Sequence, residues 1–257
     1  MDFLKSMTEF YANEGAEELR FVENSTHLLE FNTAMRQICR FLPANSRILD
    51  NCAGGGEYAF SLAEKGHCVT AGDLLPRNVK LLRERQKRTP ILRDIYEGDA
   101  LDLSRFGENE FDAVLCMGAL YHLQNPADRR RAVEESLRVL AEDGIFVCTY
   151  MNRHAVILGN LRGDIADIAE VMEFAKTGSE GIFYASAPEE MQGLMDGCGL
   201  ETLCHSALDG MSIFLSATAG LVSSEGLSRY EEYHRFACET PSLLGYSYHN
   251  IWIGRRK

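Results

Sequence analysis

The chain has 257 residues, with 26 lysines and arginines against 38 aspartates and glutamates, which gives a formal net charge of −12 at pH 7. The 46% hydrophobic and 25% charged residues are typical of a globular protein and argue against global disorder. The acidic balance argues against nucleic acid as the main partner, and no apolar run approaches the ~20 residues of a membrane helix, so no membrane partner is expected.

The eight cysteines do not form the pattern of a disulfide scaffold or a zinc site. No CxxC occurs, and Cys52, Cys68, Cys116 and Cys148 lie within or beside apolar runs, where cysteine behaves as a small hydrophobic residue. The first dozen residues lack the apolar segment of a signal peptide. We therefore expect reduced thiols, a cytoplasmic protein and no metal centre.

Residues 1–46 have helical patterns, and four apolar runs that read as strands follow them. Each run ends in small or acidic residues: RILDNCAGGG (47–56), HCVTAGD (67–73), FDAVLCMG (111–118) and GIFVCTY (144–150). A weaker strand is expected within 91–100.

Helical patterns separate these strands. One helix closes at Gly66, a second begins near Pro76, and a third covers 128–144 and is expected to end at Gly144. Alternation of strand and helix on this scale predicts βαβ units and an α/β fold, with a parallel sheet covered on both faces.

The second half departs from this alternation. Residues 151–187 are predicted to form a helical insertion after the fifth strand. A helix (PEEMQGLMDGCG), a strand (near LETLCHSAL), a helix (near 220–238) and a last strand (YSYHNIWIG) then follow. No linker long enough to separate two domains is present.

A glycine turn with three aspartates around it suggests a site for a nucleotide-like ligand. Glycines 54–56 lie between the first strand and a helix, where the backbone can approach a ligand closely. Asp50 ends the first strand, Asp73 ends the second, and Asp99 follows the third. A carboxylate at the tip of the second strand can accept both hydroxyls of a ribose. The alternatives are a helix cap for Asp73 and a turn residue for Asp99, but all three acids together favour a cofactor cleft.

The blocks ILDNCAGGG, GD, EGDALDLSRFGENEFDAVLCMGALYHL and RVLAEDG resemble the class I S-adenosylmethionine-dependent methyltransferases, and most closely the bacterial small-molecule type. The resemblance covers 45–150, and more loosely the final helix–strand pairs. It implies a Rossmann-like, seven-stranded, mostly parallel sheet whose last strand is antiparallel. It also implies a single domain over 1–257, with an N-terminal helical lid (1–46), a cofactor-binding core (47–150), an inserted substrate cap (151–187) and C-terminal helix–strand pairs (188–257).

The same resemblance implies S-adenosylmethionine as the cofactor and assigns the first half of its site to the glycine turn. Asp50, Gly54 and Gly56 would form the turn under the methionine part, together with Cys52 and Ala53. Cys52 stands where the family pattern has glycine.

Four further positions complete the cofactor site that the resemblance implies. Asp73 would hold the ribose and Leu74 would lie against the adenine. Asp99, with the backbone of Ala100, would take the adenine amino group, and Met117 would line the cleft at the end of the fourth strand.

Two alternative functions stay open. A dinucleotide oxidoreductase fits less well, because an acid precedes the glycines and the GDA and FDAV blocks have no role in its pattern. A non-catalytic S-adenosylmethionine-binding or regulatory chain is supported by Cys52 alone.

The segment after the fourth strand limits which classes of methyl acceptor are expected. Family members that methylate nucleic-acid amino groups carry an Asn/Asp-Pro-Pro-aromatic block there. The pattern of the metal-dependent catechol methyltransferases has an acidic residue at the end of that strand. This chain has CMGALYHLQNP. We expect metal-independent methyl transfer to a small-molecule acceptor by in-line displacement, with the oligomeric state left open.

Several side chains are candidates for the acceptor end. Tyr121 and His122 follow the fourth strand and are the catalytic candidates, and the alternative is that both pack under the insertion. Tyr11 and Glu30 belong to the lid hypothesis, with a solvated helix face as the alternative for Glu30. Two further histidines are candidates to line the acceptor pocket, although a structural role is the favoured interpretation: His234 and His249.

Overall fold

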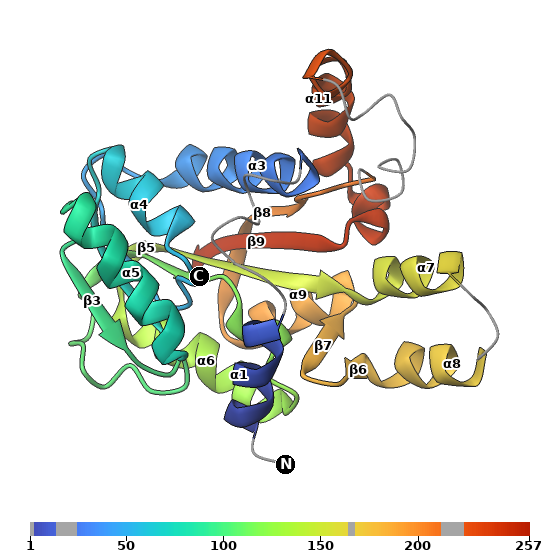
Figure 1. Cartoon of the computed structure of the whole chain (residues 1–257), viewed down its shortest axis with the longest axis horizontal. Helices are drawn as coiled ribbons and strands as arrows, with labels where there is room; N and C mark the ends of the chain where they lie inside the picture. Colours follow the sequence, from blue (N-terminus) through green and yellow to red (C-terminus); the bar gives the residue numbers. More distant parts are fainter. Residues whose placement is uncertain (1–2, 14–24, 164–167, 212–223) are drawn as a thin grey trace.

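The computed structural model describes residues 3–13, 25–163, 168–211 and 224–257 (Figure 1). A central sheet runs in the order β3-β2-β1-β4-β5-β9-β8. Its strands are β1 (Arg47–Asp50), β2 (Cys68–Asp73), β3 (Asp94–Glu97), β4 (Phe111–Cys116), β5 (Leu140–Asn152), β8 (Leu200–Ala207) and β9 (His249–Arg256).

Strands β1 to β5 are parallel, whereas β9 lies antiparallel between β5 and β8. The predicted mostly parallel sheet with an antiparallel last strand is therefore confirmed, although two further short strands, β6 (Ser179–Glu180) and β7 (Phe183–Ser186), bring the sheet in the described ranges to nine strands instead of the predicted seven. Because β9 runs in the opposite direction, its first residue lies at the same edge of the sheet as the last residues of β1 to β5.

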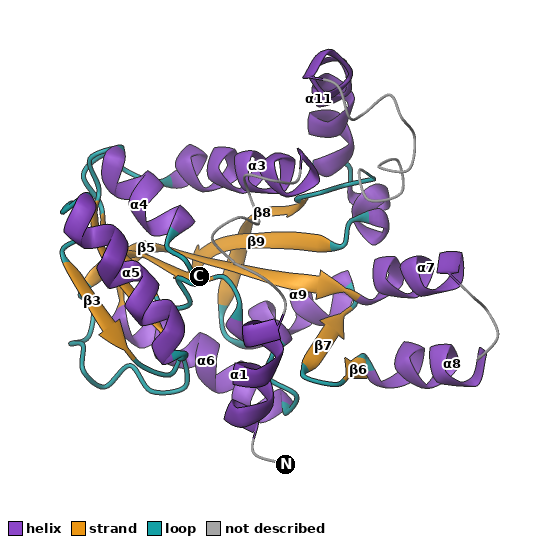
Figure 2. Ribbon diagram, in the orientation of Figure 1, coloured by secondary structure: helices purple, strands orange, loops and turns teal. Residues whose placement is uncertain are grey.

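Helices cover both faces of the sheet (Figure 2). Side chains of α3 (Ser25–Phe41), α4 (Glu57–Glu64) and α5 (Pro76–Arg88) share one apolar cluster with Ile48 and Leu115. Side chains of α6 (Pro126–Val139) and α9 (Pro188–Gly197) share a second cluster with Leu49 and Val114. Successive strand residues point to opposite faces, so an apolar run fills both clusters at once.

The helix predicted over 128–144 ends earlier than expected. It stops at Val139, and Leu140 already pairs with Phe111 in the sheet. Gly144 lies inside β5, where a Cβ would come within 2.6 Å of Leu140 Cδ1. That glycine gives room to a buried leucine and does not end the helix.

The insertion after β5 is only partly helical. It contains α7 (Arg153–Gly163) and α8 (Ile168–Thr177), followed by a hairpin of β6 (Ser179–Glu180) and β7 (Phe183–Ser186). In Figure 1, α7 and α8 extend from the end of β5 away from α4 and α5. The two short strands carry too few residues for a periodic signal.

The β6–β7 hairpin extends the sheet at the carboxyl end of β4. Strand β7 pairs with Met151 and Asn152 of β5, while β9 pairs with β5 along its other edge as far as Met151. Because a strand has two edges, β7 lies in line with β4, beyond the residue where β4 ends.

Two further α-helices in the described part of the chain are α1 (Phe3–Asn13) and α11 (Ser224–Cys238), and a 3-10 helix η4 (Pro241–Tyr246) precedes β9. Parts of the predicted N-terminal lid (1–2 and 14–24) and residues 220–223 of the helix expected near 220–238 lie outside the described residues. Within the described ranges, no helix is long and apolar enough to cross a membrane.

Candidate cofactor and acceptor site

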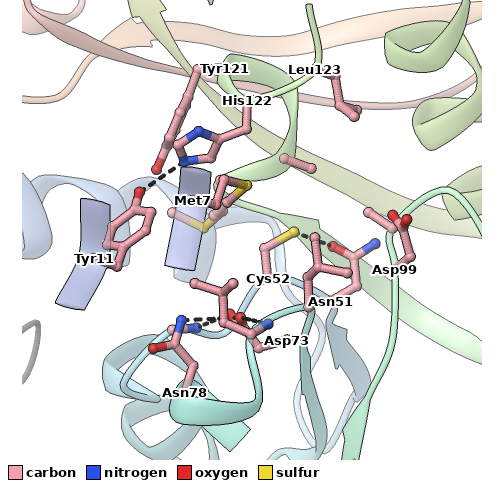
Figure 3. Close-up of a pocket in the computed structure, with 17 residues that line it drawn as sticks. Met7, Tyr11, Asn51, Cys52, Asp73, Asn78, Asp99, Tyr121, His122 and Leu123 are labelled. Carbon is pink, nitrogen blue, oxygen red and sulfur yellow. Dashed lines mark hydrogen bonds between the residues drawn. The ribbon is translucent and has the colours of Figure 1, made fainter. Parts of the chain in front are cut away.

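An open pocket, hereafter the cleft, lies at the carboxyl ends of β1 to β4 and below α1 (Figure 3). Both catalytic candidates, Tyr121 and His122, line it. So do seven of the ten predicted cofactor residues: Cys52, Gly54, Asp73, Leu74, Asp99, Ala100 and Met117.

The turn after β1 is open toward the cleft at one glycine and closed at another. Gly54 has a φ of +53°, and a Cβ added there would meet nothing within 4 Å. Gly56 has a φ of +91°, and its Cβ would lie 2.6 Å from Leu82 Cδ2 and 2.9 Å from Phe60 Cδ2. Gly54 thus leaves room for a ligand, whereas Gly56 allows α4 to pack against α5.

Asp73 fixes this turn from the neighbouring strand. Its Oδ2 accepts a hydrogen bond from the Gly54 N–H (2.8 Å), and its Oδ1 accepts from the Leu75 N–H (2.9 Å) and from Asn78 Nδ2 (3.1 Å) (Figure 3). The carboxylate therefore anchors the start of α5 and lines the cleft at the same time. The N-terminus of α5 has no side-chain cap, so the helix-cap alternative for Asp73 is wrong in its strict form, and the ribose assignment stays a prediction.

Asp99 combines the two alternatives considered for it. Its Oδ1 accepts a hydrogen bond from the Leu101 N–H (2.9 Å), as a turn residue does, and the side chain lines the cleft beside Ala100.

Asp50 lies beneath the turn and lines neither of the two cavities described here. Its burial raises its pKa to about 7, against the effect of a hydrogen bond from the Cys52 backbone, and the nearby Asp73 carboxylate adds to the increase. Asp50 therefore supports the turn from below.

Cys52, which departs from the family pattern, is accommodated by a glycine on the facing segment. A Cβ added at Gly118 would lie 3.3 Å from the Cys52 Cβ. The Cys52 thiol donates to Asn51 Oδ1 (3.4 Å), and its hydrogen bond with Cys116 and its burial raise its pKa well above the ordinary value. The Cys52 side chain is therefore neutral and fits beside Gly118, so it does not block the cleft.

The two ring nitrogens of His122 are both engaged in hydrogen bonds. Nε2 is 2.8 Å from the Tyr11 hydroxyl of α1 (Figure 3). Nδ1 is 3.2 Å from the Ile182 carbonyl in the β6–β7 hairpin. Burial lowers the pKa of His122 to about 4. This arrangement suits a residue that holds α1 and the hairpin over the cleft better than a general base.

A second pocket, hereafter the chamber, adjoins the cleft. The two share Cys52, Gly54, Met117 and Tyr121. The chamber is further lined by residues of the α4 N-terminus, β5, α3 and β9, namely Ala53, Gly55, Glu57, Tyr58, Thr149, Glu30 and His249. Tyr121 belongs to the short 3-10 helix η2 (Ala119–Tyr121) and lies at the junction of the two cavities.

The chamber was largely missed by the sequence reasoning. Tyr58 and Thr149 were not singled out, although Thr149 lies close to the carboxyl end of a predicted strand, which is a usable signal. Glu30 is buried, so the alternative of a solvated helix face is wrong for it.

His234 has the structural role favoured for it. It is buried, and its Nε2 lies 2.9 Å from Thr33 Oγ1, which ties α11 to α3. Burial lowers its pKa to about 4.

The buried titratable groups predict a loss of stability in mild acid. His122 and His234 have folded-state pKa values of about 4, below the ordinary 6.5, so their contribution is present above pH 6.5 and is lost as the pH falls toward 4. Asp50 acts in the opposite direction, because its raised pKa favours the folded state as the pH falls from 7. Burial also lowers the pKa of His205 to about 4, so three histidines act against one carboxyl group, and the free energy of unfolding should fall by roughly 3 kcal/mol from pH 6.5 to 5.

Urea unfolding at both pH values measures this change. His122→Gln should remove roughly 1.5 kcal/mol of the histidine contribution, whereas His154→Gln, at an exposed position, should leave the pH dependence unchanged. An unchanged pH dependence in His122→Gln would mean that His122 is protonated in the folded chain.

Comparison with known proteins agrees with this geometry. Residues 49–148 match a family described as a methyltransferase domain. The ubiquinone biosynthesis O-methyltransferase of Xanthomonas axonopodis pv. citri (strain 306) is 36% identical over 99 residues, which are 38% of this chain and 41% of that protein. The glycine/sarcosine N-methyltransferase of Parasynechococcus marenigrum (strain WH8102) is 32% identical over 114 residues, which are 44% of this chain and 40% of that protein.

The match thus spans about two fifths of the length of these curated relatives. The fold extends further. A 1,6-didemethyltoxoflavin-N1-methyltransferase of Burkholderia thailandensis, solved with 1,6-didemethyltoxoflavin and S-adenosylhomocysteine, superposes with a TM-score of 0.58 at 14% identity, covering 99% of this chain and 88% of that one. Residues 49–148 thus match a methyltransferase domain in sequence, and the chain shares the fold of solved S-adenosylmethionine-dependent methyltransferases. The resemblance seen in the sequence is confirmed.

The residues of this methyltransferase domain fit the family's cofactor. The turn leaves open space at Gly54 and Gly55, where a ligand can approach the backbone. Acidic groups beside the turn suit a ligand with a positive sulfonium centre, because opposite charges attract strongly in a partly buried site.

Proposed function

We propose that this chain binds S-adenosylmethionine in the cleft and transfers its methyl group to a small-molecule acceptor. The observation that carries the proposal is the Gly54 turn, which is open on the cleft side and hydrogen-bonded to Asp73 at the carboxyl edge of the sheet. Relatives named for ubiquinone biosynthesis and for glycine and sarcosine support a small acceptor.

In this proposal, different residues contact different parts of the cofactor. Asp73 holds the ribose, Leu74 lies against the adenine, and Asp99 with Ala100 takes the adenine amino group. The methionine part lies against Cys52, Ala53, Gly54 and Met117, with Asp50 and Gly56 supporting the turn.

When bound, S-adenosylmethionine supplies a methyl group on a positively charged sulfur. The chain's own contribution is to orient the acceptor in line with that group and to exclude water, without a metal ion. Tyr121, at the junction of cleft and chamber, is placed to touch the acceptor, and His122 positions the lid.

The lid and the cap meet above the cleft in this proposal. Residues 1–46 form the lid, whose α1 packs on the β6–β7 hairpin through Phe10 and Phe183 with ring centroids 5.1 Å apart. Residues 151–187 form the cap at the acceptor end. Together with the core at 47–150 and the pairs at 188–257, they form a single cytoplasmic methyltransferase domain.

Turnover with a panel of small acceptors tests this function. The purified chain is incubated with S-adenosylmethionine and with glycine, sarcosine, 3,4-dihydroxybenzoate and related hydroxyls and amines, and S-adenosylhomocysteine release is measured. Release that depends on one acceptor class supports the proposal. Cofactor binding without release from any acceptor would favour a non-catalytic, regulatory chain.

A further inference from the structure

We propose that His249, oriented by Glu30 and Asp209, is the proton acceptor of the chamber, and that the methylated atom is therefore an oxygen or nitrogen that arrives with a removable proton. This inference rests on the proposed function and specifies the acceptor class for the same site. It concerns groups on three separate elements that the fold brings together.

Asp209, which follows β8, is held rigidly behind the histidine. Its Oδ1 accepts hydrogen bonds from Ser247 Oγ (2.6 Å) and from the Tyr248 N–H (2.7 Å), and its Oδ2 accepts from the His249 N–H (3.0 Å). Asp209 is only 2% exposed, so these three donors offset the cost of burying its charge.

The imidazole of His249 lies between this carboxylate and that of Glu30 on α3. Nδ1 is 3.4 Å from Asp209 Oδ2 and 3.6 Å from Glu30 Oε2. Both carboxylates are buried. Two negative charges at this distance stabilise a proton on Nδ1 and the charged ring that forms when a second proton arrives.

The opposite side of the ring faces the chamber. Nδ1 is fully buried against the carboxylates, whereas His249 as a residue lines the chamber wall with Glu30 and Thr149. The two nitrogens of an imidazole lie on different sides of the ring, so Nε2 is directed away from the carboxylates. Tyr121 also lines the chamber, with its ring centroid 6.3 Å from that of His249.

Because the chamber adjoins the cleft, His249 is positioned to accept a proton during methyl transfer. The chamber meets the cleft at Gly54, Met117 and Tyr121, which lie at the proposed methionine end. In the transfer, the acceptor's lone pair forms a bond to the methyl carbon, the carbon–sulfur bond breaks, and its electron pair returns to sulfur. The proton leaves the acceptor for Nε2, and the imidazolium is stabilised by Glu30 and Asp209 until it releases the proton to solvent.

The same three side chains could also bind a cation, since their ligand atoms lie within 4.8 Å of one another. The hydrogen bonds favour the proton acceptor. Asp209 already accepts from three donors, and its Oδ2 lies 3.4 Å from His249 Nδ1. A metal ion would have to displace this arrangement.

The protonation pattern of the ring is the first test and requires no acceptor. In protein labelled with ¹⁵N-histidine, the ring nitrogens of His249, assigned by their loss in His249→Gln, are expected to show neutral imidazole with the proton on Nδ1. In Glu30→Gln and Asp209→Asn the share of this tautomer should fall. A wild-type ring with its proton on Nε2, a ring protonated on both nitrogens at the assay pH, or ring signals shifted by stoichiometric Zn²⁺ or Mn²⁺, would overturn the proposal.

Turnover of the panel acceptors is the second test. His249→Gln should lower kcat about 100-fold or more, as expected for loss of a proton acceptor. Glu30→Gln and Asp209→Asn, which act through His249, should lower kcat with little change in KM. His67→Gln, just before the amino end of β2 and outside the lining of both cavities, is the matched control and should keep wild-type rates. A His249→Gln variant that stays within threefold of the wild-type kcat would contradict the inference.

Calorimetry with S-adenosylhomocysteine on the same variants separates the two proposals. Failure of the wild-type chain to bind would refute the proposed function itself. Binding together with a ring protonated on Nε2 would refute only the role of His249. Should the panel yield no turnover, the ring protonation pattern alone decides the inference.

Discussion

Replacing Asp73 by alanine is expected to weaken S-adenosylmethionine binding about 100-fold, which corresponds to about 2.8 kcal/mol. The variant loses a charged acceptor for the ribose hydroxyls and also the carboxylate that fixes the turn. Hydrogen bonds to charged groups contribute ~1.5–3 kcal/mol each. The Gly54 N–H, the Leu75 N–H and Asn78 would all lose their partner.

Calorimetry measures this change, and two variants control it. Glu97→Ala removes an exposed acid directly opposite Asp73 in the sheet and should bind the cofactor as the wild type does. Asp73→Asn keeps one acceptor oxygen and should lie between the wild type and alanine. Wild-type affinity in a folded Asp73→Ala chain would refute the ribose assignment.

Replacing Gly56 by alanine is expected to lower the free energy of unfolding by about 2–4 kcal/mol. A left-handed backbone costs a non-glycine residue about 1–2 kcal/mol, and overpacking of a core site costs about 1–3 kcal/mol. Here φ is +91°, and the added methyl would lie 2.6 Å from Leu82 Cδ2 and 2.9 Å from Phe60 Cδ2. Both neighbours are fully buried, so they have little room to move.

The neighbouring Gly55 is a matched control within the same turn. A Cβ added at Gly55 meets nothing within 4 Å, and its φ lies outside the left-handed region. Gly55→Ala should therefore change stability by less than about 0.5 kcal/mol, in the range of neutral surface substitutions. Urea unfolding of both variants distinguishes them, and equal stability would mean that packing of α4 on α5 does not depend on Gly56.

The contrast between Gly54 and Gly56 shows what the sequence could and could not predict. The run of glycines after an apolar strand and before a helix predicts the turn, because few other residues accept its backbone angles. Which glycine faces a ligand depends on Leu82 and Phe60, which pack from α5 and α4. That information lies in the tertiary contacts and is absent from the local pattern.

The parallel core was predictable because nearly continuous apolar strands alternate with helices. The sequence pattern does not predict the structure where contacts between residues far apart in the chain determine it. Leu140 leaves the helix to pair with Phe111, and the β6–β7 hairpin forms because β5 offers a free edge beyond β4. The hydrogen-bond partners of the catalytic candidate His122 were likewise not predictable from the local pattern. His122 is engaged by Tyr11 and by the Ile182 carbonyl, neither of which is near it in sequence.

The chamber was hidden for a similar reason. Glu30, Asp209 and His249 are far apart in the sequence and come together only because β9 inserts antiparallel beside β5. An antiparallel last strand brings its first residue to the edge where the parallel strands end. The topology that the resemblance implied was therefore sufficient to place His249 near the cleft, although not to identify its partners.

Calorimetric titration of the purified chain with S-adenosylmethionine tests directly whether the cleft binds this cofactor. We predict binding at one site per chain, with a Kd in the micromolar range usual for enzyme substrates, displaced by S-adenosylhomocysteine and weakened by Asp73→Ala. Absence of binding at millimolar ligand, or binding that is unchanged in Asp73→Ala, would contradict the account of the cleft.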